Sequence, residues 1–235
     1  MSPVQADPDW YLARHRRRPI AYLADLGVLG SNVILTHAVH LDEREVALLA
    51  DAGANIAHCA TTALKGAYGV TAVGRLPEMQ AQGVNITIGT DGSNNSNYHD
   101  LMRATYLIAG LFKDARRDPT LFPAEQAYSC ATINGAKALQ MSDQIGSLEV
   151  GKKADFVAHD TDRPEWRPLF NVANQLVWSA DGRGVHSVWV DGVRVVDNYR
   201  CTTIDEDRIY AEVQTAGEAI VARSGLPIKS RWPVV

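Results

Sequence analysis

The 235-residue sequence contains little cysteine, and its three cysteines, Cys59, Cys130 and Cys201, lie far apart in the chain. No two of them form a Cys-x-x-Cys pair, which argues against a disulfide framework and against a zinc site built from thiolates. We therefore expect three reduced thiols and a cytoplasmic protein.

The sequence also lacks long apolar runs and an excess of positive charge. A bilayer-spanning helix needs roughly 20 apolar residues, and no run approaches that length; the basic cluster at residues 14–18 is not followed by the apolar core of a signal peptide. A formal net charge of −4 at pH 7 gives no electrostatic attraction to nucleic acid or to anionic lipid. We expect neither a nucleic-acid nor a membrane partner, and a small molecule as the ligand.

The first part of the chain repeats a strand followed by a helix. Apolar or β-branched runs at residues 33–35, 55–58 and 84–88 predict strands, the first of them covered on both faces. Apolar spacing and capping residues predict helices at residues 9–26 with an interruption at Pro19, and at 43–52, 76–82, 99–113 and 123–139. Right-handed crossovers would make the strands parallel and bring their carboxyl ends to one edge.

Beyond residue 140 the pattern changes to short strands, predicted at residues 145–150, 154–157, 188–190 and 193–196. Asp191-Gly192 between the last two is typical of a two-residue hairpin turn. A helix is predicted at residues 205–222 and a tail at 227–235. The chain thus divides into an α/β segment (1–140), a small composite β domain (141–200), and a C-terminal helix with its tail (201–235).

Each of the three early strands ends close to a polar side chain: His37, His58 and Asp91. Imidazole and carboxylate groups are good ligands for zinc or ferrous iron, and parallel α/β folds place their active sites at such strand ends. The alternative is that each residue is satisfied by local hydrogen bonds. Three such residues in register favour the metal site.

Several stretches together resemble the amidohydrolase superfamily, and most closely its cytosine-deaminase-like branch, which includes guanine, adenosylhomocysteine and triazine hydrolases. The stretches are Thr36-His37-Ala38-Val39-His40-Leu41, Ala57-His58-Cys59, Ile88-Gly89-Thr90-Asp91-Gly92, residues 131–139 and residues 145–155. The similarity covers most of this chain but only the C-terminal half of a family member.

The resemblance implies a fold and a role for several residues. The fold is part of a TIM (β/α)₈ barrel, its last three strand–helix units, followed by the C-terminal part of a small β-sandwich domain and a terminal helix. The resemblance implies one divalent metal, zinc or iron, with Asp91 as metal ligand and proton acceptor and His37 as the group that polarises the attacking water or the substrate. It implies that His58, Ser93, Asn94 and Asn95 line the substrate pocket, although a structural role suits each of these four equally.

The sequence departs from the family pattern at two places. No two histidines are separated by a single residue, and His37 is followed three residues later by His40 rather than by a glutamate. The His-x-His pair of the first barrel strand and the His-x-x-Glu of the fifth are therefore absent. We expect an N-terminally truncated chain whose remaining metal ligands belong to the missing half.

The implied activity is metal-dependent hydrolysis of C–N bonds other than peptide bonds, by a deaminase or a triazine-type hydrolase of a nitrogen heterocycle. We expect the parent protein to be the enzyme and the 235-residue chain alone to be inactive. The alternative is a catalytically inactive remnant or interaction protein that keeps the half-barrel scaffold.

Half a barrel leaves two unpaired strand edges and an apolar inner face without an opposite wall. We therefore predict that the isolated chain self-associates into homo-oligomers or is poorly soluble. Light scattering should give a mass that rises with concentration, and a clean monomer that unfolds cooperatively would count against a truncated barrel.

Overall fold

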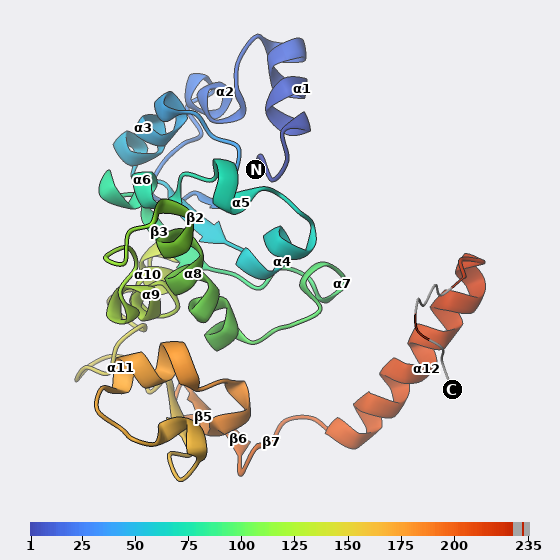
Figure 1. Ribbon diagram of the computed structural model, residues 1–235. Coiled ribbons are helices and arrows are strands. Elements are labelled where there is room, and N and C mark those ends of the chain that lie inside the picture. Colours follow the sequence, from blue (N-terminus) through green and yellow to red (C-terminus); the bar gives the residue numbers. More distant parts are fainter. Residues whose placement is uncertain (228–231, 233–235) are drawn as a thin grey trace.

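The computed structural model describes residues 1–227 and 232 and contains two sheets with their surrounding helices (Figure 1). The first sheet consists of β1 (Ile34–Thr36), β2 (Asn55–His58) and β3 (Asn85–Ile88), which pair in parallel in that order. Leu35, Ile56 and Ile86 form one row across the sheet, and all three are buried. The three strands predicted from the sequence are confirmed within one or two residues.

Helices precede, connect and follow these strands, and several of them cover one face of the sheet (Figure 1). They are α1 (Ala6–His15), α2 (Pro19–Asp25), α3 (Glu43–Ala52), α4 (Ala60–Lys65), α5 (Val70–Val73), α6 (Leu76–Ala81), α7 (Ser93–Ser96), α8 (Leu101–Arg116), α9 (Ala124–Cys130) and α10 (Ile133–Ala138). The predicted interruption at Pro19 is confirmed, because α1 ends at a left-handed Arg16 and α2 begins at the proline.

The prediction of one helix over residues 123–139 is wrong. Thr132 has φ −129° and ψ −99° and separates α9 from α10. The physical reason is a contact with β3: the Asn134 amide donates to the Ile86 carbonyl at 3.0 Å, and the Asn85 amide donates to the Asn134 carbonyl at 3.0 Å. These hydrogen bonds hold α10 against β3. The chain therefore changes direction at Thr132, between α9 and α10.

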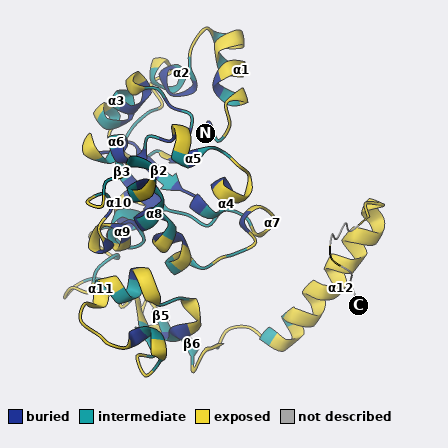
Figure 2. Cartoon of the chain, in the orientation of Figure 1, coloured by how far each residue is buried: buried dark blue, intermediate teal, exposed yellow. Residues whose placement is uncertain are grey.

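The second face of the sheet is less covered than the sequence predicts. Ile34 of β1 is 40% exposed and Thr36 is also exposed, whereas Leu35 between them is buried. The expectation that this strand is covered on both faces is therefore wrong. Most of the main cluster of buried apolar residues lies between this sheet and its helices (Figure 2).

Arg18 at the start of α2 forms ion pairs with two carboxylates at the start of α3, Glu45 at 2.7 Å and Asp42 at 2.9 Å. Glu45 is 1% exposed and accepts hydrogen bonds from the Arg18 guanidinium at 2.7 Å and from the Ile20 backbone N–H at 2.9 Å. It also completes the capping box predicted at this helix start, because the Asp42 side chain accepts from the Glu45 N–H and the Glu45 side chain accepts from the Asp42 N–H. Glu45 thus fixes both the start of α3 and its position against α2.

The second sheet is antiparallel, with strands β4 (Phe156–His159), β5 (Val185–Val190), β6 (Val193–Asp197) and β7 (Arg200–Cys201) in that order. Asp191 and Gly192 have φ values of 51° and 77°, as a type I′ hairpin turn requires, which confirms that prediction. Between β4 and β5 the chain forms the short helices η1 (Pro164–Trp166), α11 (Val172–Asn174), η2 (Gln175–Ser179) and η3 (Gly182–Gly184).

The strand predicted at residues 145–150 is wrong. Gly146 has φ +92°, which ends any extended run there, and a side chain at this position would meet Ala136 and Ile133. The segment instead turns against α10. Residues 156–201 form a single sheet in the part of the chain that the structure describes, so no second layer of the predicted sandwich is found there.

The terminal helix α12 (Glu206–Ser224) confirms the prediction for residues 205–222 and extends away from both sheets (Figures 1 and 2). None of its residues is buried. Of the predicted tail at 227–235, only Pro227 and Trp232 lie within the described residues. No helix among the described residues is long and apolar enough to cross a membrane.

Replacing Glu45 with alanine should lower the free energy of unfolding by about 3 kcal/mol, because it leaves the buried Ile20 N–H without an acceptor and Arg18 with only the more exposed Asp42 carboxylate. Urea denaturation measures this change. Glu43→Ala is the control: Glu43 lies in the same helical turn with an 89% exposed side chain, and it should change stability by less than about 0.5 kcal/mol. Equal effects of the two substitutions would contradict this account.

Stability should also fall on acidification because of His58. Its ring is 1% exposed, and burial, with a smaller contribution from His37, lowers its pKa from 6.5 to about 4. Between pH 4 and 6.5 the unfolded chain binds more protons than the folded chain, so the free energy of unfolding rises with pH in this window. Between pH 7 and pH 4, His58 should account for a loss of about 3 kcal/mol in urea denaturation. His58→Gln should remove this part of the pH dependence, whereas His15→Gln in α1 should leave it.

Candidate metal centre

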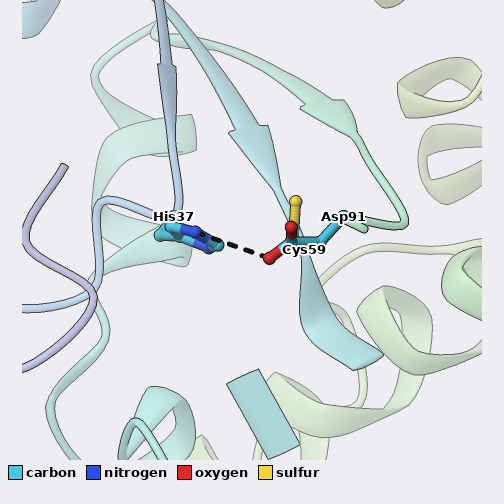
Figure 3. A group of neighbouring side chains, drawn as sticks. All are labelled: His37, Cys59 and Asp91. Atoms are coloured by element: carbon cyan, nitrogen blue, oxygen red, sulfur yellow. Dashed lines mark ion pairs between the residues drawn. The ribbon is translucent and has the colours of Figure 1, made fainter. Parts of the chain in front are cut away.

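Three side chains that follow successive strands lie close together, and His37 and Asp91 face each other (Figure 3). His37 follows β1, Cys59 follows β2 and Asp91 lies three residues after the end of β3. The nitrogen, sulfur and oxygen atoms that they offer all lie within 4.8 Å of one another. The structure thus brings together two of the three residues that the sequence analysis singled out, His37 and Asp91, and adds Cys59.

Backbone conformation explains how these side chains meet. Strict alternation would put His37 on the same face as Leu35, among the helices. Its backbone instead adopts the left-handed conformation, with φ 71°, and Asp91 does the same with φ 63°. This conformation is uncommon for residues other than glycine, and it turns both side chains out of the alternation of their strands.

The Asp91 carboxylate is held by its own loop through one oxygen. Oδ1 accepts from the Gly92 N–H at 2.6 Å and from the Asn95 amide at 3.4 Å, whereas Oδ2 lies 3.7 Å from Nε2 of His37. The Gly92 hydrogen bond is the largest of the effects that lower the pKa of Asp91 below its usual value. Asp91 is therefore ionised near neutral pH, with one oxygen directed at the centre of the cluster.

The His37 ring is neutral and incompletely satisfied. Burial is the first cause that lowers its pKa from 6.5, and the nearby Asp91 charge only partly offsets this effect. Nδ1 is buried without a hydrogen-bond partner among the described residues, and the ring packs edge-on against Tyr68 at 5.6 Å. A neutral imidazole has a lone pair on one nitrogen, so His37 can accept a hydrogen bond or bind a metal.

Cys59 was missed as a site residue by the sequence analysis. Its thiol is 2% exposed, and burial raises its pKa to about 11. A Cβ atom on Gly89, the residue that follows β3, would come within 3.0 Å of the sulfur, so the glycine leaves room for the thiol. All three cysteines are free, as expected. The signal was available, because Cys59 follows its strand immediately, as His37 does.

His58 lies apart from this cluster. Alternation in β2 places it on the same face as Ile56, and its ring packs near Phe112 of α8, with centroids 6.2 Å apart. A ring that is 1% exposed offers no surface to a substrate in this structure. Its substrate-binding role stays a prediction without support from this packing.

The three predicted pocket residues after Asp91 form the single-turn helix α7 and are exposed. Asn95 supports the Asp91 carboxylate as described above. The Ser93 hydroxyl is 2.9 Å from Nε2 of His99, and the Asn94 carbonyl accepts from Lys65 at 3.4 Å. Substrate contact by Ser93, Asn94 and Asn95 stays a prediction.

The donor atoms of the cluster fit a divalent metal. Imidazole nitrogen, thiolate sulfur and carboxylate oxygen are the three ligand types that zinc takes in proteins, and three protein ligands with one open position are typical of catalytic zinc. In the described residues, His37, Cys59 and Asp91 are the one such group of three or more.

Comparisons with known proteins agree with this geometry. The sequence model of the amidohydrolase family matches residues 10–195. A 5-methylthioadenosine/S-adenosylhomocysteine deaminase of Moorella thermoacetica is 41% identical over 201 residues, which are 86% of this chain and 46% of that protein. A 5′-deoxyadenosine deaminase of Methanosarcina acetivorans is 37% identical over 211 residues, 90% of this chain and 48% of that protein.

Solved structures that resemble this chain include a further deaminase and a hydrolase. An adenosine deaminase from Xanthomonas campestris with bound zinc matches with a TM-score of 0.88 and 31% identity, over 94% of this chain and 50% of that one. The atrazine chlorohydrolase of Arthrobacter aurescens, complexed with zinc, matches with a TM-score of 0.81 and 26% identity, over 90% and 46%. The chain spans about half the length of the relatives it matches. The resemblance drawn from the sequence motifs is confirmed, and this chain belongs to the amidohydrolase family.

Proposed function

We propose that this chain carries the aspartate and histidine of a metal-dependent site that hydrolyses the C–N bond of an amino group on a nitrogen heterocycle. The observation that carries the proposal is the convergence of His37 and Asp91 after the ends of β1 and β3, the two outer strands of one parallel sheet. The names of the relatives favour an adenosine-type nucleoside, because the deaminases are 37–41% identical and the atrazine chlorohydrolase is 26% identical.

Asp91 would hold the metal, and zinc is favoured over iron because the two solved relatives named above contain zinc. When bound, a divalent metal lowers the pKa of water and so supplies a nucleophile near neutral pH. Asp91 is the proton acceptor in this proposal. It is ionised, and Oδ2 is free of loop hydrogen bonds, so it can take a proton from the attacking water and pass it to the departing amine.

His37 faces the Asp91 carboxylate across the proposed metal position. Its neutral ring, 3.7 Å from the Asp91 carboxylate, places one nitrogen where it can serve the metal or the reacting water. Ser93, Asn94 and Asn95 in the exposed turn of α7 are the candidates for substrate contact, since that turn follows Asp91 directly.

We further propose that β1, β2 and β3 are the last three strands of a (β/α)₈ barrel within residues 1–140. The parallel order and the polar strand ends support this interpretation. Residues 141–200 would be the small β domain, and residues 201–235 a terminal extension. Activity then requires further barrel strands, and the 235-residue chain alone should be inactive.

The sharpest test combines this chain with the part of the Moorella thermoacetica deaminase that it does not match. The two polypeptides, co-expressed and purified with zinc, should release ammonia from 5′-deoxyadenosine, whereas this chain alone should not. Asp91→Asn should lower the rate by about 10³-fold, because it removes a metal ligand and the proton acceptor together. Asp51→Asn, at an exposed aspartate in α3, should leave the rate unchanged.

Two outcomes would contradict the proposal. One is a stable complex of the two polypeptides, with zinc bound, that releases no ammonia. The other is ammonia release that Asp91→Asn does not change. Either result would favour the inactive scaffold.

A further inference from the structure

We propose that Cys59 is a thiolate ligand of the metal that Asp91 holds, in a site that His37 completes within this chain. The inference rests on the proposed function and adds a ligand to it. The sulfur comes from the strand between those that carry the other two groups, and it lies within 4.8 Å of both ligand atoms.

The spacing of the three atoms suits a single ion. Tetrahedral zinc with bonds of about 2.3 Å to sulfur and about 2.0 Å to nitrogen and oxygen places its ligand atoms roughly 3.3–3.6 Å apart. The His37 Nε2 and Asp91 Oδ2 atoms are 3.7 Å apart, and no pair in the cluster exceeds 4.8 Å. Side-chain movements of about 1 Å would bring all three atoms to coordination distance.

The surroundings leave the sulfur available. Cys59 is not in a disulfide, and its hydrogen bond to the Ala57 carbonyl is long, at 3.8 Å. Gly89, directly after the neighbouring strand β3, leaves space for the sulfur, because a side chain there would press against it. The backbone of Cys59 is held between two elements, since the residue follows β2 and is the N-cap of α4 (Ala60–Lys65).

A thiolate ligand has a consequence for metal choice. Soft sulfur ligands favour zinc over the harder divalent metals, which prefer oxygen. His37, Cys59 and Asp91 together would give three protein ligands, which is the number found in catalytic zinc sites. This number is reached without a His-x-His pair. The site therefore has a ligand set of its own within these 235 residues.

Cobalt(II) tests the inference, because a cobalt–thiolate bond gives a charge-transfer absorption in the near ultraviolet that nitrogen and oxygen ligands do not give. The full 235-residue chain, reduced and titrated anaerobically with cobalt(II), should bind one equivalent and show this absorption. Cys59→Ser should abolish the band and weaken cobalt binding by about tenfold or more, since loss even of outer-shell partners costs that much.

Cys130→Ser is the matched control. Cys130 is also buried, at 1% exposed, and the Asn134 amide contacts its sulfur at 3.7 Å in a different part of the fold. This variant should keep both the band and the affinity. Circular dichroism and thermal unfolding of both variants separate a lost ligand from a lost fold.

Each other outcome overturns the inference in a recognisable way. Cobalt that binds without the band, or with a band that Cys59→Ser does not remove, excludes the sulfur as a ligand. If Asp91→Asn then releases that cobalt, the metal site of the proposed function stands without Cys59. A folded chain that binds no cobalt also overturns the inference, while the proposed function is still decided by the ammonia assay of the two-polypeptide complex.

Discussion

The parallel, in-register pairing of β1, β2 and β3 is the constraint on which the candidate site depends. The row of Leu35, Ile56 and Ile86 aligns the three strands, and burial of these side chains against the helices fixes that alignment. A shift by one residue would exchange the two faces of a strand. Because the strands run in the same direction, their carboxyl ends lie at one edge, and His37, Cys59 and Asp91 come from three separate segments to the same place.

The local backbone conformation of two residues directs their side chains toward the site. His37 and Asp91 are held in the left-handed region, which is unfavourable for residues with a side chain, and the surrounding packing has to support it. The Gly92 N–H fixes one oxygen of Asp91 and leaves the other directed at His37. The result is an ionised carboxylate, a neutral imidazole and a buried thiol whose donor atoms lie within 4.8 Å of one another.

Elements that depend on local signals could be predicted from the sequence. The capping pair Asp42 and Glu45 marks the start of α3, and Asp191-Gly192 marks the hairpin of the second sheet. The break at Thr132 could not be predicted, because it follows from the bond between Asn134 and a strand almost 50 residues earlier in the chain. Cys59 was missed for a related reason: which of two neighbouring residues faces the site depends on the exact strand end. His58 had the more suggestive side chain, but the alternation of β2 places it among the helices.

The central claim is that the ends of β1, β2 and β3 form one metal site. Anomalous diffraction tests it most directly, with data from crystals of the zinc-loaded chain collected on both sides of the zinc absorption edge. The account predicts one strong anomalous peak between the side chains of His37, Cys59 and Asp91. Zinc bound elsewhere on the chain, with no peak within coordination distance of Asp91, would contradict it.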